Sequence, residues 1–235
     1  MTPNDAGQTL DELARLVAEG RGVTETAESV IALARLDLAC DYAGITVRDR
    51  HGSYHSLAVT DPVVERADQL QYELGEGPCV LALDEQREIV TEDLSSDPRW
   101  PRWGSRAAEL GLTSVLAVNL TDDGKRMGVL NLYSTQRRTF TVEDIAFGHV
   151  FGARAAVALS NSHRIEQFHA AIDGRTVIGQ AQGILMERYQ LNADEAFAVL
   201  RRLSQERNVR LRHVATSLVS PRSLDESFSE AVHER

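Results

Sequence analysis

The sequence predicts an α+β protein in which an antiparallel sheet with flanking helices is followed by a long helix and three short C-terminal helices. Strand-like and helical segments alternate through the first 140 residues, which is typical of helices packed on a sheet. No proline occurs between Pro101 and Pro221, so a long helix can follow. Beyond residue 175 apolar residues recur at spacings of three and four, which indicates short amphipathic helices.

The N-terminal part contains five segments with strand character and several helical ones. Helices are predicted at residues 10–19 and about 25–36, and further helices begin at Pro62 and Pro78 and within residues 95–111. The predicted strands lie within residues 41–49, 53–61, 87–93, 112–120 and 125–134. The first two and the last two are joined by short glycine-containing turns, which predicts two hairpins of one antiparallel sheet.

A new helix is predicted to begin after Thr141. Thr141 is a suitable N-cap with Asp144 three residues later, and Phe140 and Ile145 occupy the positions of a hydrophobic staple. We expect residues 141–172 to form a long connecting helix that is able to form a coiled coil. Its second half carries a seam for a partner helix in a homodimer, formed by Ile165, Phe168 and Ile172. Gly174 is the place where this helix is expected to kink or end.

The segment "RTVIGQAQGILMER", residues 175–188, predicts an amphipathic helix with two unexpected glycines. Its apolar face contains Val177, Ile178, Ala181, Ile184 and Leu185. The opposite side contains Arg175, Gly179, Gln182, Gly183 and Met186. Each interior glycine costs roughly 1 kcal/mol relative to alanine. The missing side chains permit close approach, either by another helix or by a ligand.

Two more short helices follow. The second is capped by Asn192 with Glu195 at its third position, and the third covers about residues 210–219. The third is expected to expose Arg210, Arg212 and His213. Three such helices form a small bundle.

Charge is distributed unevenly along the chain. The net charge is -10, yet residues 162–222 carry nine arginines against six acidic side chains. The tail, residues 223–235, is acidic and is expected to be flexible. The basic segment is therefore where a polyanion is expected to bind.

Several functional classes are disfavoured by composition. The chain has no apolar run long enough to span a membrane and no signal-peptide pattern, so we expect a soluble cytoplasmic protein. Cys40 and Cys79 are expected to be reduced thiols, and no spacing suggests a metal site. We find no catalytic motif and expect no enzyme activity and no cofactor.

Residues 175–219 resemble the ANTAR domain, an RNA-binding three-helix module of bacterial transcription antitermination regulators. The matching positions include Ile178, Ala181, Leu185, Ala196, Phe197, Leu200, Leu211, Val214 and Ala215. Two positions depart from the family pattern: Gln182 replaces a frequent lysine, and His213 replaces a frequent acidic residue. The resemblance implies binding, as a dimer, to paired RNA hairpins with small loops, which prevents a terminator from forming. From this resemblance together with the exposed faces, we expect the RNA-binding residues to be Arg175, Gly179, Gln182, Gly183, Met186, Arg210 and Arg212.

Residues of about 25–160 resemble a GAF domain, on the segments "SLAVTD", "GEGPC" and "RTFTVEDIAFGHVFGARAAVAL". This resemblance implies a six-stranded antiparallel sheet with a small-molecule pocket, so a ligand or protein partner at this domain is expected without being identified. The chain would then comprise a GAF sensor domain over residues 1–160 with its N-terminal helix, and an ANTAR domain over residues 173–222.

Two rival functions remain open from the residues alone. A GAF-regulated DNA-binding factor with a helix-turn-helix motif also ends in a short helical bundle, and a signalling scaffold could use the bundle for docking only. Individual residues are ambiguous too. Cys79 follows a proline at a helix start, where a thiolate is favoured, but a small buried thiol is the simpler interpretation. Trp100 and Trp103 could line a pocket or anchor a loop.

Overall fold

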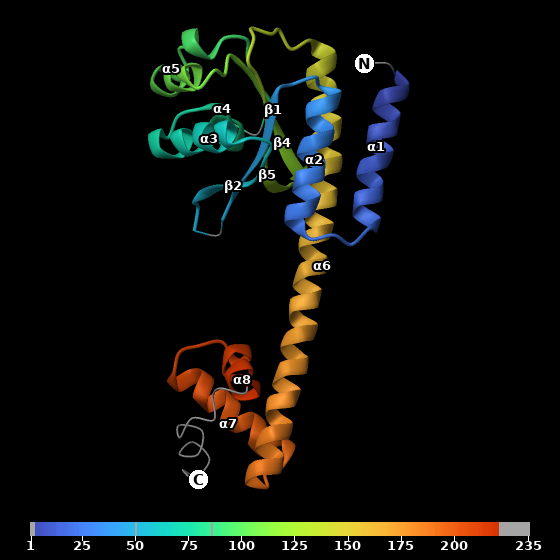
Figure 1. Ribbon diagram of the computed structural model, residues 1–235, viewed down its shortest axis with the longest axis vertical. Coiled ribbons are helices and arrows are strands. Elements are labelled where there is room, and N and C mark those ends of the chain that lie inside the picture. The colour runs from blue at the N-terminus through green and yellow to red at the C-terminus, as the bar shows by residue number, and fades with distance from the viewer. Residues whose placement is uncertain (1–2, 50, 86, 221–235) are drawn as a thin grey trace. The chain divides into compact units, whose positions relative to one another are not determined.

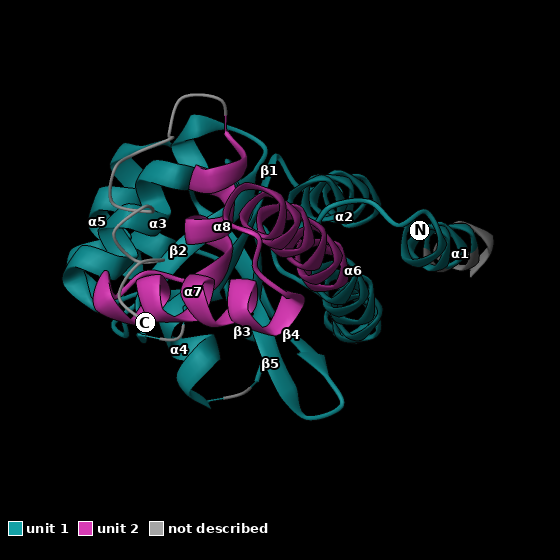
Figure 2. Ribbon diagram, turned by 90° about the horizontal axis from the view of Figure 1, so that it is seen from below, with its two compact units in different colours: residues 1–165 teal, residues 166–235 magenta. Residues whose placement is uncertain are grey.

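The computed structural model describes residues 3–49, 51–85 and 87–220. The predicted flexible tail at residues 223–235 lies outside the described residues. The chain divides into two compact units, unit 1 with residues 1–165 and unit 2 with residues 166–235 (Figure 2). Each unit has its own hydrophobic core.

Unit 1 is built on one antiparallel sheet in the order β2-β1-β5-β4-β3. The strands are β1 (Tyr42–Arg48), β2 (Tyr54–Val59), β3 (Ile89–Thr91), β4 (Ser114–Asp122) and β5 (Lys125–Ser134). All five segments with strand character are confirmed, and within the described residues the sheet has five strands where the GAF resemblance implied six. Asp123 and Gly124 have φ values of 46° and 74°, as a two-residue hairpin turn of type I′ requires.

Helices cover both faces of this sheet (Figure 1). On one face pack α2 (Val23–Asp37) and the first part of α6 (Val142–Tyr189), with α1 (Pro3–Ala18) packed on α2. On the other face lie α3 (Pro62–Leu74), α4 (Pro78–Glu85), the 3₁₀ helix η1 (Leu94–Ser96) and α5 (Pro101–Glu109). Because strand side chains alternate, Leu130 and Leu132 of β5 enter the first core, whereas Val129 and Tyr133 enter the second.

Local sequence signals fix the start of α6. The Asp144 backbone N–H donates to Thr141 Oγ1 at 3.1 Å, and the Thr141 N–H donates to Asp144 Oδ2 at 3.0 Å. The predicted reciprocal cap is therefore confirmed. Within the sheet-packed part, Gly148 and Gly152 allow the helix to approach β4, since a Cβ on Gly152 would lie 2.7 Å from Val118 Cγ1.

The helix does not end at Gly174, contrary to that expectation. It continues through 48 residues to Tyr189. A Cβ at Gly174 would meet nothing within 4 Å, so no packing contact requires a glycine there. The free-energy cost of one glycine in a helix is small compared with the stabilisation that the packing of the following residues provides.

Unit 2 is a bundle of three helical segments: the C-terminal part of α6, α7 (Ala193–Glu206) and α8 (Leu211–Val219). Asn192 and Glu195 form the predicted capping box at the start of α7. The core is formed by Ala181, Leu185, Leu191, Ala196, Leu200, Leu203, Val214, Ala215 and Leu218. The basic segment of the sequence thus folds as a unit of its own.

Alanine substitutions at Gly152 and at Gly174 of α6 are expected to change the stability in opposite directions. Gly152→Ala should lower the stability of unit 1 by about 1–3 kcal/mol, because the new methyl group would lie 2.9 Å from the Asn119 carbonyl oxygen, a backbone atom. Gly174→Ala is the matched control on the same helix and should raise stability by up to about 1 kcal/mol. Urea unfolding measures both. Equal effects of the two substitutions would contradict this account of packing.

Candidate RNA-binding face and a buried sensor-domain cluster

In unit 2, α6 buries one side and exposes the other. Ala181 and Leu185 are fully buried against α7 and α8. Gly179 and Gly183 lie on the exposed side, and Met186 there is 37% exposed. The division into a core side and an exposed side that the sequence predicted is therefore present.

No packing contact within the described residues requires a glycine at position 179 or 183. A Cβ added to Gly179 or Gly183 would meet no atom within 4 Å, in contrast to Gly152. Packing within the described chain therefore does not require either glycine. Both glycines weaken the helix, and contacts within the described residues do not account for them.

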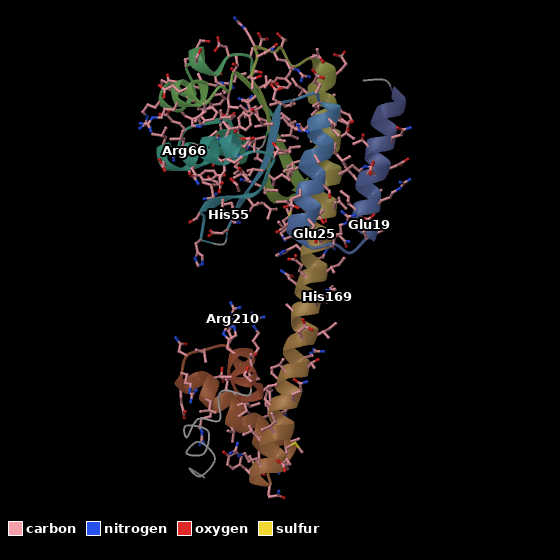
Figure 3. All side chains as sticks on the ribbon, in the orientation of Figure 1. Glu19, Glu25, His55, Arg66, His169 and Arg210 are labelled. Carbon is pink, nitrogen blue, oxygen red and sulfur yellow. The ribbon has the colours of Figure 1, made fainter. Side chains whose placement is uncertain are left out.

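The other predicted RNA-binding residues lie in two places. Arg175 is exposed one turn before Gly179. Gln182 Nε2 donates to the Ala193 carbonyl oxygen at 3.2 Å, so this side chain joins α6 to the start of α7. Arg210, labelled in Figure 3, is the N-cap of α8. Arg212 lies in the first turn of α8, and both arginines are exposed. Since α8 packs on the buried side of α6, the structure groups five of the seven residues on one helix face and places the two arginines on a separate element.

The predicted dimer seam is also on α6. Phe168 and Ile172 are 68% and 61% exposed, whereas Ile165 is partly buried. The structure therefore leaves two large apolar side chains one turn apart exposed on this helix.

Unit 1 contains a buried polar cluster that the sequence analysis missed. It lies between the sheet and the helices α3 and α4, and consists of Thr46, Ser56, Asp68, Gln71, Tyr72, Cys79, Asn131 and Tyr133. The fully buried Asp68 carboxylate accepts hydrogen bonds from Ser56 Oγ (3.0 Å), Gln71 Nε2 (3.2 Å), Tyr133 OH (3.3 Å) and Thr46 Oγ1 (3.4 Å). Asn131 Oδ1 is buried in the same cluster with no hydrogen-bond partner. The alternation of Val129, Asn131 and Tyr133 along β5 was the available signal.

Burial controls the ionisation of this cluster. Desolvation raises the pKa of Asp68 to about 7, although the hydrogen bonds from Ser56, Tyr133, Thr46 and Gln71 act in the opposite direction. Burial also raises the pKa of the Cys79 thiol to about 12, so Cys79 stays protonated. The simpler interpretation of Cys79 as a buried thiol is confirmed.

The two tryptophans serve as anchors in this structure. Trp103 is fully buried and its Nε1–H donates to the Ala67 carbonyl oxygen at 2.9 Å, while Trp100 packs edge-on against it with ring centroids 6.0 Å apart. Both belong to the core under α3 and α5. The anchoring interpretation of these residues is therefore confirmed.

Comparison with known proteins assigns both parts of the chain. The family model of the GAF domain matches residues 20–160, and that of the ANTAR domain matches residues 166–219. No curated protein matches the chain. The chain therefore belongs to the GAF domain family and combines a GAF domain with a C-terminal ANTAR domain.

Solved structures agree on the fold of the first part. The GAF domain of an Acinetobacter phosphoenolpyruvate-protein phosphotransferase is 17% identical with a TM-score of 0.55, over 71% of this chain and 99% of that one. Free methionine-R-sulfoxide reductase from Neisseria meningitidis is 16% identical with a TM-score of 0.54, over 70% and 95%. The phycoerythrobilin-bound GAF domain of a cyanobacterial phytochrome is 14% identical with a TM-score of 0.53, over 67% and 96%. At these identities the likeness shows the fold alone.

The two domains define the class of protein. GAF domains are sensor domains and ANTAR domains are RNA-binding antiterminator domains, so both are regulatory rather than catalytic, although one structural neighbour is an enzyme. Within residues 3–49, 51–85 and 87–220, no helix combines the length and apolar character needed to cross a membrane. The same residues contain no group of three or more His, Cys, Asp or Glu side chains placed to hold a metal ion.

The raised pKa of Asp68 predicts a pH-dependent stability. Between about pH 4 and pH 7, Asp68 is protonated in the folded state and ionised in the unfolded state. The unfolded chain then binds fewer protons, so the free energy of unfolding falls as the pH rises through this window and levels off above it. Asp68→Asn should flatten this dependence. Urea unfolding at pH 4 to 8, with the exposed Asp84→Asn as control, measures it, and identical slopes for wild type and Asp68→Asn would contradict the prediction.

Proposed function

We propose that this protein is an RNA-binding transcription antitermination regulator. Its ANTAR domain binds tandem small-loop RNA hairpins as a dimer and so keeps a terminator from forming, and its GAF domain modulates this binding. The observation that carries the proposal is the exposed α6 face on which Gly179 and Gly183 present bare backbone to solvent.

The chemistry of this face suits an unpaired loop of RNA. Bases in a small loop are splayed out and can be read by stacking and hydrogen bonding, whereas the deep groove of a paired stem cannot. Bare backbone at Gly183 admits a base, and Met186 offers an apolar contact. Arg175, Arg210 and Arg212 supply the charge that attracts phosphates, with guanidinium groups that hydrogen-bond to them.

The exposed apolar side chains of α6 support dimer formation. Phe168 and Ile172 would leave water by contact with a second copy of the helix, with Ile165 completing the seam. A dimer carries two ANTAR domains and can hold both hairpins of one RNA. Binding the second hairpin is then an intramolecular step, which raises affinity without new contacts.

The alternative, a DNA-binding helix-turn-helix factor, requires a helix that enters the major groove. The last helix, α8, has nine residues, and among the polar side chains it exposes are Arg212 and His213. The bare glycine backbone lies on a different helix. Duplex DNA therefore serves as the discriminating control in the binding experiments.

Gly183→Leu should weaken binding to a tandem-hairpin RNA by at least about tenfold, which corresponds to 1.4 kcal/mol. The leucine fills the space that a base would occupy while the helix stays intact. Gly174→Ala, on the same helix but off this face, should leave the affinity unchanged. Filter binding with tandem-hairpin RNA, single-hairpin RNA and duplex DNA measures these affinities. Equal RNA affinity of wild type and Gly183→Leu, or tighter binding to DNA, would refute the proposal.

Replacing Arg210 or Arg212 by alanine should weaken binding in a different manner. Each lost phosphate contact should reduce the slope of log affinity against log salt by roughly one unit and affect different hairpin sequences equally. Titrations at four salt concentrations test this, with the exposed Arg106→Ala of unit 1 as control. A wild-type affinity that is independent of salt would argue against phosphate contacts altogether.

A further inference from the structure

The predicted dimer residues and the predicted RNA-binding residues of α6 share one helix face in unit 2. From Phe168 the sequence steps through Ile172, Arg175, Gly179, Gly183 and Met186 at intervals of four, three, four, four and three residues. At 3.6 residues per turn these positions form one stripe along the helix. We refer to these six residues as the α6 stripe.

The α6 stripe is mostly apolar. Phe168, Ile172 and Met186 are its largest exposed apolar side chains, and the two glycines between Ile172 and Met186 add no side chain. Arg175 is its single cation. A surface that served RNA alone would be richer in cations, since phosphate contacts depend on them. Apolar side chains separated by glycines are instead well suited to close approach of a second helix.

We propose that, in the absence of RNA, a second copy of this chain covers the α6 stripe as far as Met186, so that the second copy and RNA compete for Gly179 and Gly183. This inference rests on the proposed function. Pairing over Ile165, Phe168 and Ile172 holds the dimer together in both states. Only the downstream part, from Gly179 to Met186, exchanges the partner helix for an RNA loop.

The area available agrees with pairing between copies. With apolar side chains of roughly 150–200 Å² each, the exposed fractions of Phe168, Ile172 and Met186 amount to about 300 Å² per copy. Two copies therefore contribute about 600 Å² from these side chains alone toward the roughly 1,000 Å² of a specific interface.

Competition on one face gives the protein a way to regulate RNA binding. A state of the dimer that favours full-length pairing lowers the apparent RNA affinity by the fraction of molecules that are paired downstream of Ile172. RNA, in return, weakens that downstream pairing by the same coupling free energy. A change in the GAF domain that alters helix pairing would therefore alter RNA affinity without touching an RNA contact.

Disulfide trapping in the full chain tests this proposal. The variants are Met186→Cys downstream and Phe168→Cys upstream, and the native Cys40 and Cys79 are both buried. A disulfide forms only between residues whose Cα atoms lie about 4.4–6.8 Å apart. Both variants should cross-link between copies without RNA under a mild oxidant. Tandem-hairpin RNA should block the cross-link of Met186→Cys but not that of Phe168→Cys.

The affinity of the cross-linked protein provides the second readout. Cross-linked Met186→Cys should bind RNA at least about tenfold more weakly than the same variant after reduction, while Phe168→Cys should bind equally in both forms. Cross-linking of Phe168→Cys without Met186→Cys, or full RNA affinity of cross-linked Met186→Cys, would overturn the proposal. Absence of RNA binding by the reduced wild-type chain would instead refute the proposed function, and the competition with it.

Discussion

The packing of one helix against two separate cores is the constraint on which the rest of this structure depends. In unit 1, α6 buries Phe151 and Leu159 against the sheet, and in unit 2 it buries Ala181 and Leu185 against α7 and α8. Residues Val142–Tyr189 form one helix, and each segment of it turns a buried side to the core of its own unit. In each unit, the exposed side of α6 is the side that the core of that unit leaves uncovered, and in unit 2 this side bears Gly179 and Gly183.

The second core of unit 1 contains buried polar groups. A buried carboxyl group that accepts from four donors lies beside a buried amide oxygen without a partner, and the desolvation of both groups costs folding free energy. Asn131 and Tyr133 of β5 belong to this cluster, whereas their neighbours Leu130 and Leu132 face the core that α6 shares. The two faces of β5 therefore belong to different cores, one that contains the cluster and one that contains the first part of α6.

Local signals in the sequence predicted much of this structure. The reciprocal caps at Thr141 and Asn192, the Asp123–Gly124 turn and the apolar spacing of residues 177–185 each depend on residues close together in the chain, and each is present. The division of the C-terminal part of α6 into a buried and an exposed side was predicted from the same periodicity.

What the sequence did not reveal depends on contacts between distant residues. The cluster around Asp68 combines strands β1, β2 and β5 with helices α3 and α4, so the alternation along β5 alone does not show which residues of the other elements join it. Cys79 sits at a helix start, yet burial outweighs that local preference for a thiolate. Likewise, α6 does not end at Gly174, because the packing of the residues beyond it stabilises the continued helix.

The central claim is that the bare glycine face of α6 contacts RNA, and the methyl group of Met186 reports on it directly. The chain has three methionines, of which Met127 lies in unit 1 and serves as an internal reference. In the full chain labelled with ¹³C-methyl methionine, tandem-hairpin RNA should shift or broaden the Met186 resonance saturably and leave that of Met127 in place. Assignment comes from Met186→Leu. A Met186 resonance that stays unchanged while filter binding shows the protein saturated with RNA would contradict the account.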